Sequence, residues 1–162
     1  MAGDRAKRAT SEPNTRALLA EGVDAGLVGV ALIAGYYRIA ADPAQLRHQL
    51  ALSGRSAGTE DLARAANLLQ MKSRIIRRVT AKRLGAIPYP AILALRDGSF
   101  AVLAVASERG RVRLVDPITR SATEMSLDEA ESLSTGEVLL VTRRLGGAGI
   151  DPDTFGLPWF WP

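Results

Sequence analysis

The sequence predicts an α+β domain of two layers, in which N-terminal helices pack on a mostly antiparallel sheet. Two observations predict this class. Apolar residues recur at helical spacing in the first half of the chain, whereas the second half holds short strand-like runs separated by turn signals. At 162 residues, of which 47% are apolar and 23% charged, the chain has the size and composition of one globular domain with its own core.

Three segments of the chain differ in composition. Residues 1–14 are polar, mixed in charge and without periodicity, so we expect a flexible N-terminal arm. Residues 15–145 carry the periodic segments and form the predicted domain. Residues 146–162 are rich in Gly and Pro and end in aromatic residues, which is the composition of a linker.

Three helices are predicted in the first half of the chain. Asp24 caps the first helix, and the run from Leu27 to Tyr37 is apolar nearly all round, so this helix belongs in the core. Asp42-Pro43 begins the second helix, because Asp is a favoured cap and Pro a favoured first helical residue. Thr59 caps the third. Its apolar residues at helical spacing are Leu62, Ala65, Ala66 and Leu69.

Strands are predicted from residue 72 onward, where β-branched residues replace the helical period. The runs are residues 72–79, 91–96, 100–107, 111–115 and 136–143. Asp97-Gly98 is a hairpin-turn signal between the second and third runs. A short helix is expected before the last strand, because Ser126 and Glu129 have the spacing of a capping box.

The composition excludes several classes of function. The chain holds no cysteine, which excludes disulfides, thiolate nucleophiles and zinc–thiolate sites. No glycine-rich segment has the Lys and the spacing of a phosphate-binding loop, so ATP binding is not expected in this domain. The longest apolar run is about half the ~20 residues that a membrane-spanning helix needs. Residues 1–16 also lack the apolar core of a signal peptide.

Four motifs follow one another along the chain. They are Asp24-Ala25-Gly26 with Leu32-Ile33-Ala34-Gly35-Tyr36-Tyr37, the run Ile87 to Leu93, Val115-Asp116-Pro117, and the run Phe155 to Pro162. Together they resemble the papain-like peptidase domain at the N-terminus of bacteriocin exporters. The resemblance is closer to the peptidase-like domain of haemolysin-type secretion transporters, which keeps that fold without the protease. It covers residues 15–162 and implies a papain-like cysteine peptidase fold.

The active members of that family combine a Cys nucleophile, a preceding Gln that donates to the oxyanion, a His that opens the hairpin strand, and an Asp before Pro. By motif matching these roles fall on Ala25, Leu19, Ser99 and Asp116, respectively. A methyl group cannot attack a carbonyl, Leu19 cannot donate a hydrogen bond, and Ser99 cannot act as a base near neutral pH. The resemblance therefore implies a degenerate site. Asp116 is expected to cap the turn at Pro117 and to accept a hydrogen bond from Ser99.

His48 is the one histidine of the chain. A triad of Ser99, His48 and Asp116 has the right residue types, but triads are defined by geometry. His48 falls on the second predicted helix, whereas the cleft of a papain-like fold lies between the first helix and the sheet. We therefore expect a surface histidine without a catalytic role.

The densest positive run consists of Arg74, Arg77, Arg78, Lys82 and Arg83. A solvated surface is the favoured interpretation, since most charge runs have that role. The sharper alternative is contact with an acidic partner. Nucleic acid is not expected, because aromatic residues are not interleaved with these charges and no nucleic-acid-binding motif is present.

The resemblance implies the N-terminal domain of a type I secretion ABC exporter, on the cytoplasmic face of the bacterial inner membrane. We expect it to recognise or tether the unfolded exported polypeptide, with an acidic repeat toxin as one candidate cargo. A groove beside the degenerate site would bind extended chain through apolar and aromatic side chains and main-chain groups. The candidate contacts are Tyr36, Tyr37, Tyr89, Arg96 and Phe100.

Two alternatives stay open. The domain is a structural interaction module that contacts the exporter's own membrane and ATPase domains without touching the cargo, or, less favoured, it is a residual peptidase. No metal or cofactor is expected within it. The resemblance places ATP in a downstream ATPase domain, beyond a transmembrane domain toward which residues 146–162 would lead.

Overall fold

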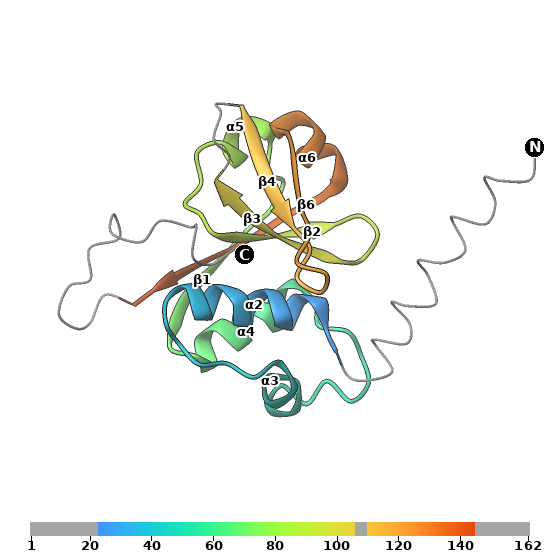
Figure 1. Ribbon diagram of the computed structural model, residues 1–162. Coiled ribbons are helices and arrows are strands. Elements are labelled where there is room, and N and C mark those ends of the chain that lie inside the picture. Colours follow the sequence, from blue (N-terminus) through green and yellow to red (C-terminus); the bar gives the residue numbers. More distant parts are fainter. Residues whose placement is uncertain (1–22, 106–109, 145–162) are drawn as a thin grey trace, which may run out of the picture.

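The computed structural model of the chain describes residues 23–105 and 110–144. A six-stranded antiparallel sheet lies between two groups of helices (Figure 1). On one face lie α2 (Ala25–Tyr36), α3 (Pro43–Gln49) and α4 (Thr59–Leu68); on the other lie α5 (Ala81–Leu84) and α6 (Leu127–Leu133). The predicted α+β class is confirmed. The prediction of two layers is wrong, because α5 and α6 cover part of the second face.

The sheet combines a meander with one returning strand. Its order is β1-β6-β2-β3-β4-β5. The meander is formed by β2 (Ala91–Leu95), β3 (Phe100–Val105), β4 (Arg111–Val115) and β5 (Ala122–Ser126), and β6 (Ser134–Arg143) then inserts between β2 and β1 (Met71–Ile76). The sequence predicted a simple meander, without β5 and α5. It also extended β1 to residue 79, whereas the strand ends at Ile76.

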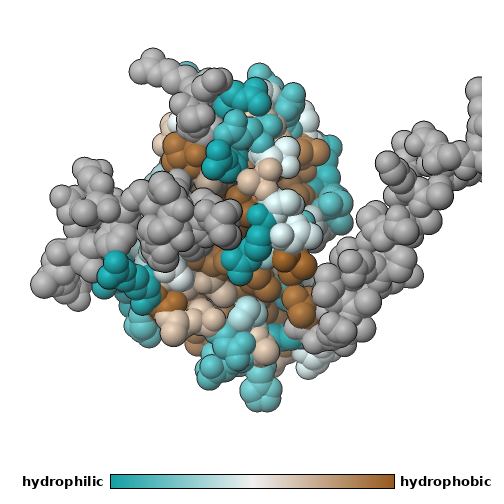
Figure 2. Space-filling model, viewed as in Figure 1, coloured by the Kyte–Doolittle hydropathy of each residue, from teal (hydrophilic) through white to brown (hydrophobic). Residues whose placement is uncertain are grey.

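Each face of the sheet has its own core, because side chains alternate along every strand. Ile92, Val102 and Leu139 point toward the α2–α4 side and are almost fully buried. Their neighbours Leu93, Leu103 and Val138 point to the α5–α6 side and are equally buried. Apolar residues are visible where the sheet meets the helices (Figure 2).

Helix α2 packs directly on the sheet, as its apolar composition predicted. Asp24 caps it and its side chain accepts hydrogen bonds from the backbone N–H groups of Gly26 and Leu27. Gly26 allows the close approach. A Cβ at Gly26 would lie 2.9 Å from both Leu62 of α4 and Phe100 of β3. Within the described residues no helix is both long enough and apolar enough to span a bilayer.

The caps of the other helices follow the sequence, with one correction. Asp42 caps α3, and the Ser126 hydroxyl accepts a hydrogen bond from the Glu129 N–H at the start of α6, as predicted. The prediction that Thr59 caps α4 is wrong by one residue, because Gly58 occupies the cap position. The Thr59 hydroxyl instead donates a hydrogen bond to the Glu137 carboxylate of β6, at 2.7 Å.

Candidate functional site

The site inferred from the sequence centres on the first turn of α2. Ala25 is the first residue of this helix and is half-buried. Its methyl group has no lone pair and no ionisable proton, so this position offers neither a nucleophile nor a base. Leu19, matched to the oxyanion position, lies outside the described residues. The chemistry of the site therefore depends on the residues around Ala25.

The Asp24 carboxylate joins three parts of the helix layer. One oxygen accepts from the N–H groups of Gly26 and Leu27, at 3.0 and 3.2 Å. The other accepts from the Ala57 N–H at 2.8 Å and lies 3.7 Å from the guanidinium of Arg47 on α3. Asp24 is only 3% exposed. Both of its oxygens are therefore committed to structure.

Ser99 and Asp116 do not form the hydrogen bond that the sequence analysis expected. The Ser99 hydroxyl and N–H both donate to the Asp97 carboxylate within the β2–β3 turn. The Asp116 carboxylate accepts from the N–H groups of Ile118 and Thr119, at 2.8 and 3.1 Å. The expected turn-capping role of Asp116 is confirmed. Ser99 finds its acceptor in Asp97 and Asp116 finds its donors in Ile118 and Thr119, so each side chain is satisfied within its own turn.

Phe100, rather than Ser99, is the β3 side chain that faces α2. Val102 packs in the core beneath α2, and Phe100 stands two residues earlier on the same face of the strand. The Phe100 ring reaches the position that a Cβ of Gly26 would occupy. A shift of one residue along a strand moves a side chain to the opposite face. The position opposite the first turn of α2 is thus filled by an aromatic ring that cannot transfer a proton.

A groove of about 460 Å³ lies next to Phe100. Its walls come from the start of α4, from the β2–β3 hairpin and from the beginning of β6. The lining residues are Ala57, Gly58, Thr59, Ala94, Leu95, Gly98, Ser99, Phe100, Thr135 and Glu137. Small, apolar and hydroxyl side chains here provide room and hydrogen-bonding groups for extended polypeptide, and none of the lining residues is a cysteine or a histidine.

The α4 side of the groove is held by Asp61. Its carboxylate accepts hydrogen bonds from the Arg55 guanidinium at 2.7 Å and from the Gly58 N–H at 2.9 Å. Arg64 lies 3.5 Å from the other oxygen. The hydrogen bond from Arg55, followed by that from Gly58 and the charges of both arginines, lowers the pKa of Asp61 below its usual value despite partial burial. Asp61 therefore stays ionised at neutral pH and fixes this wall.

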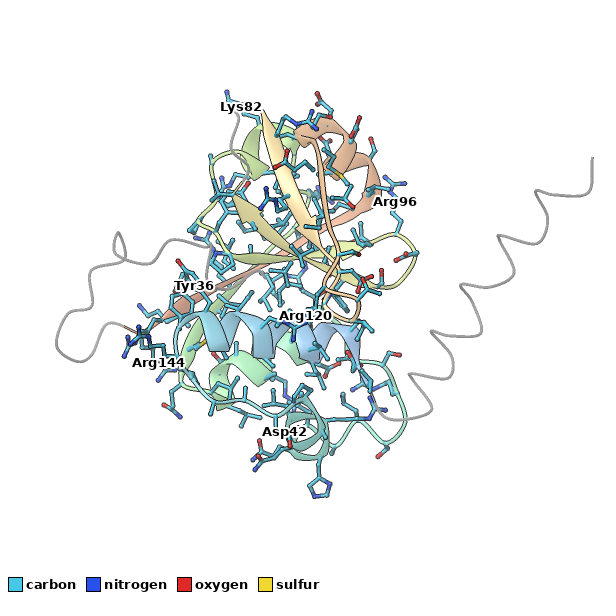
Figure 3. All side chains as sticks on the ribbon, viewed as in Figure 1. Tyr36, Asp42, Lys82, Arg96, Arg120 and Arg144 are labelled. Carbon is cyan, nitrogen blue, oxygen red and sulfur yellow. The ribbon has the colours of Figure 1, made fainter. Side chains whose placement is uncertain are left out.

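The structure does not bring the five predicted binding residues together. Phe100 lines the groove, and Arg96 lies exposed in the β2–β3 turn, where its guanidinium donates to the Ser134 carbonyl at 3.0 Å. Tyr36 and Tyr37 stand at the opposite end of α2, with ring centroids 5.0 Å apart. Figure 3 shows Tyr36 and Arg96 on opposite sides of the molecule.

Tyr89, the fifth candidate, packs against the core on the α5–α6 side of the sheet. Its hydroxyl donates to the Leu84 carbonyl, and burial raises its pKa. Burial also raises the pKa of Tyr37, with a smaller contribution from Tyr36. His48 is exposed on α3, as expected, so it is not part of the groove.

Sequence reasoning missed most of the groove. Thr59 and Glu137, whose side chains meet, are separated by 78 positions in the chain. No local pattern marks such a contact. Leu95 and Thr135 were missed for a related reason, because strand periodicity identifies core positions but not the residues that border a depression.

Comparison with known proteins assigns the family. The chain matches the peptidase C39 family over residues 17–145 and belongs to that family. It is 27% identical over 141 residues to the alpha-hemolysin translocation ATP-binding protein HlyB of Escherichia coli. That alignment covers 86% of this chain and 20% of HlyB, so the chain spans about a fifth of the length of that relative.

Solved structures share the fold. One is the N-terminal peptidase C39-like domain of the toxin secretion ATP-binding protein from Vibrio parahaemolyticus, with a TM-score of 0.63 and 24% identity over 75% of this chain and 98% of that domain. Another is a double glycine motif protease from an AMS/PCAT transporter in complex with its leader peptide. Its TM-score is 0.65, with 18% identity over 75% of this chain and 85% of the protease. The papain-like peptidase fold predicted from the sequence is confirmed.

The orientation of β3 is testable by building a thiol–imidazole pair. In Ala25→Cys/Phe100→His, we expect the imidazole to lie beside the new thiol, lower its pKa and raise its alkylation rate by iodoacetamide at pH 6 by about tenfold over Ala25→Cys. The matched control is Ala25→Cys/Ser99→His, whose imidazole starts from the β2–β3 turn, where the Ser99 side chain is directed to Asp97. Faster alkylation in the Ser99 variant than in the Phe100 variant would contradict this geometry; circular dichroism of each variant checks folding.

Proposed function

We propose that this chain is the C39 peptidase-like domain of a type I secretion ABC transporter, and that it holds unfolded exported polypeptide without cleaving it. The proposal rests on one observation: the contacts that hold the walls of the site are present, whereas its described residues include no cysteine or histidine. Asp24 and Asp61 fix the walls of the site, while Ala25 offers no nucleophile and Phe100, which faces the first turn of α2, offers no base. A groove whose walls are fixed, but which carries no thiol or imidazole, is suited to binding a polypeptide without cleaving it.

The transporter context extends this proposal to location and partners. Relatives such as HlyB are translocation ATP-binding proteins, and the chain corresponds to about a fifth of that protein. We place the domain on the cytoplasmic face of the inner membrane, beside the transporter's membrane and ATPase domains. ATP is bound in the ATPase domain, because this chain has no phosphate-binding loop.

The groove is suited to weak binding of extended chain. Leu95 and Phe100 are half-buried and offer apolar surface, while the exposed Thr135 offers a hydroxyl group. Ordering an unfolded segment costs conformational entropy, which keeps the affinity low. Low affinity fits transport, because a cargo that is recognised also has to be released.

A fluorescently labelled, uncharged and unstructured peptide of Gly, Ser, Leu and Phe tests the groove. We expect the wild type to increase its fluorescence anisotropy, and Leu95→Ser to weaken binding by at least about fivefold, because apolar surface is removed from the wall. The matched control is Leu68→Ser at the far end of α4, where the side chain is 48% exposed. Equal loss in both variants, or no binding by the wild type, would count against the groove; thermal unfolding establishes that both variants are folded.

The residual peptidase alternative requires turnover by the unmodified domain. We expect no cleavage of a fluorogenic peptide with a double-glycine site, since neither a cysteine nor a histidine lies in the described site. Cleavage that persists at constant specific activity through further purification of the domain would contradict the proposal. Cleavage that separates from the domain during purification belongs to a contaminant and leaves the proposal intact.

A further inference from the structure

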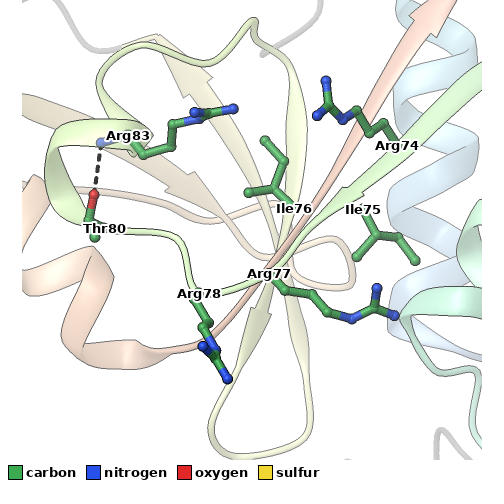
Figure 4. Close-up of a pocket in the computed structure, with 7 residues that line it drawn as sticks. All are labelled: Arg74, Ile75, Ile76, Arg77, Arg78, Thr80 and Arg83. Atoms are coloured by element: carbon green, nitrogen blue, oxygen red, sulfur yellow. Dashed lines mark hydrogen bonds between the residues drawn. The ribbon is translucent and has the colours of Figure 1, made fainter.

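The second notable surface of the molecule is rich in arginine. It consists of Arg74 on β1, Arg77 and Arg78 after it, and Lys82 and Arg83 on α5; we call these residues the arginine surface. A concavity of about 430 Å³ is lined by Arg74, Ile75, Ile76, Arg77, Arg78, Thr80 and Arg83 (Figure 4). The positive run in the sequence is therefore gathered in space around one depression.

Most of these charges are not neutralised. Arg77 pairs with Glu60 at 3.2 Å and Glu137 at 3.6 Å. In the part of the chain that the structure describes, no carboxylate lies within ion-pair distance of Arg74, Arg78 or Arg83. The guanidinium groups of Arg74 and Arg83 point toward one another above Ile76 (Figure 4). Two cations in this arrangement repel each other, and a carboxylate between them would bind both.

The arginine surface follows an edge of the sheet. The one strand that pairs with β1 in the described sheet is β6, so alternate backbone N–H and C=O groups of β1 face outward. The strand ends at a fixed bend. Arg78 has φ of 56°, and Gly136 of β6 has φ of 99°. A Cβ at Gly136 would lie 3.5 Å from the Arg78 backbone, which is an ordinary van der Waals distance. Thr80 then caps α5 through the Arg83 N–H, which sets the position of Arg83.

We infer that an acidic, extended polypeptide segment binds here by adding as a strand to the outer edge of β1. Its backbone pairs with β1, and its carboxylates contact Arg74 and Arg83. A strand edge favours this occupant over a membrane or a nucleic acid, because neither of these has a backbone that extends a β-sheet. The inference rests on the proposed function in one respect, namely that the domain handles unfolded polypeptide.

The test uses two labelled peptides that differ in charge alone, one alternating Asp with Thr and one alternating Asn with Thr. We expect the wild-type chain to bind the Asp peptide at low salt at least about tenfold more tightly than the Asn peptide. Arg74→Glu/Arg83→Glu should abolish this difference. The matched control is Arg111→Glu/Arg120→Glu, which makes the same change of net charge at two exposed positions outside the arginine surface. The control should retain the preference for Asp.

A third peptide tests strand addition. It has the same Asp content, with Pro in place of every Thr, so that it lacks those backbone donors. We expect it to bind at least about fivefold more weakly than the Asp–Thr peptide. Equal binding of these two peptides, equal effects of the two double variants, or binding to phosphatidylserine vesicles without binding to the Asp–Thr peptide would each overturn the inference.

The result for the arginine surface can be distinguished from the result for the proposed groove. Arg74→Glu/Arg83→Glu should leave binding of the uncharged Gly/Ser/Leu/Phe peptide unchanged, and Leu95→Ser should leave binding of the Asp–Thr peptide unchanged. If the uncharged peptide binds and the Asp–Thr peptide does not, the arginine surface fails while the groove stands. The reverse result supports the arginine surface and removes the groove.

Discussion

The rest of the structure depends on the buried carboxylate of Asp24. It caps α2 through two N–H groups, holds the segment before α4 through the Ala57 N–H, and lies beside Arg47 of α3. These contacts set how the three N-terminal helices lie on the sheet. Without the carboxylate, three N–H groups in a nearly dry environment lose their acceptor, and each such loss costs roughly 1–3 kcal/mol.

The contacts of Asp24 explain how the fold accommodates an alanine at position 25. In this chain the residue that precedes Ala25 serves the architecture through side-chain contacts that need no neighbouring cysteine. Asp116 is comparable, because its carboxylate closes its own turn. Both acidic residues thus retain a structural role in a site without a nucleophile. The groove between α4 and the β2–β3 hairpin is the product of that retained frame.

The elements that the sequence predicted correctly are those determined by interactions between residues close together in the chain. The starts of α2 and α3 were predicted because Asp24 and Asp42 cap them within three residues. The β2–β3 hairpin was predicted because Asp97-Gly98 is a local turn signal, and Gly98 adopts φ of 86°. In contrast, β5 is largely exposed and polar, so it has no apolar alternation to reveal it.

The predicted site was less accurate for a different reason. Motif matching placed the base position at Ser99, whose side chain is held by Asp97 in the turn, whereas Phe100 faces the first turn of α2. Glu137 illustrates the long-range part of the problem. It accepts from Thr59 in the groove and lies 3.6 Å from Arg77 of the arginine surface, so one β6 residue joins both surfaces. Such a residue is identified by the fold and not by its neighbours in the chain.

The most direct measurement of the central claim, that Asp24 maintains the frame around Ala25, is urea unfolding of Asp24→Asn beside Asp42→Asn. Asp42 is an exposed cap of α3, and Asn is also a good cap, so its replacement should change the free energy of unfolding by less than about 0.5 kcal/mol. In Asp24→Asn an amide NH₂ group replaces one carboxylate oxygen that accepts from a backbone N–H group, and an NH₂ group cannot accept that hydrogen bond. The account predicts a loss of about 2–4 kcal/mol for Asp24→Asn. Equal stability of the two variants would contradict it.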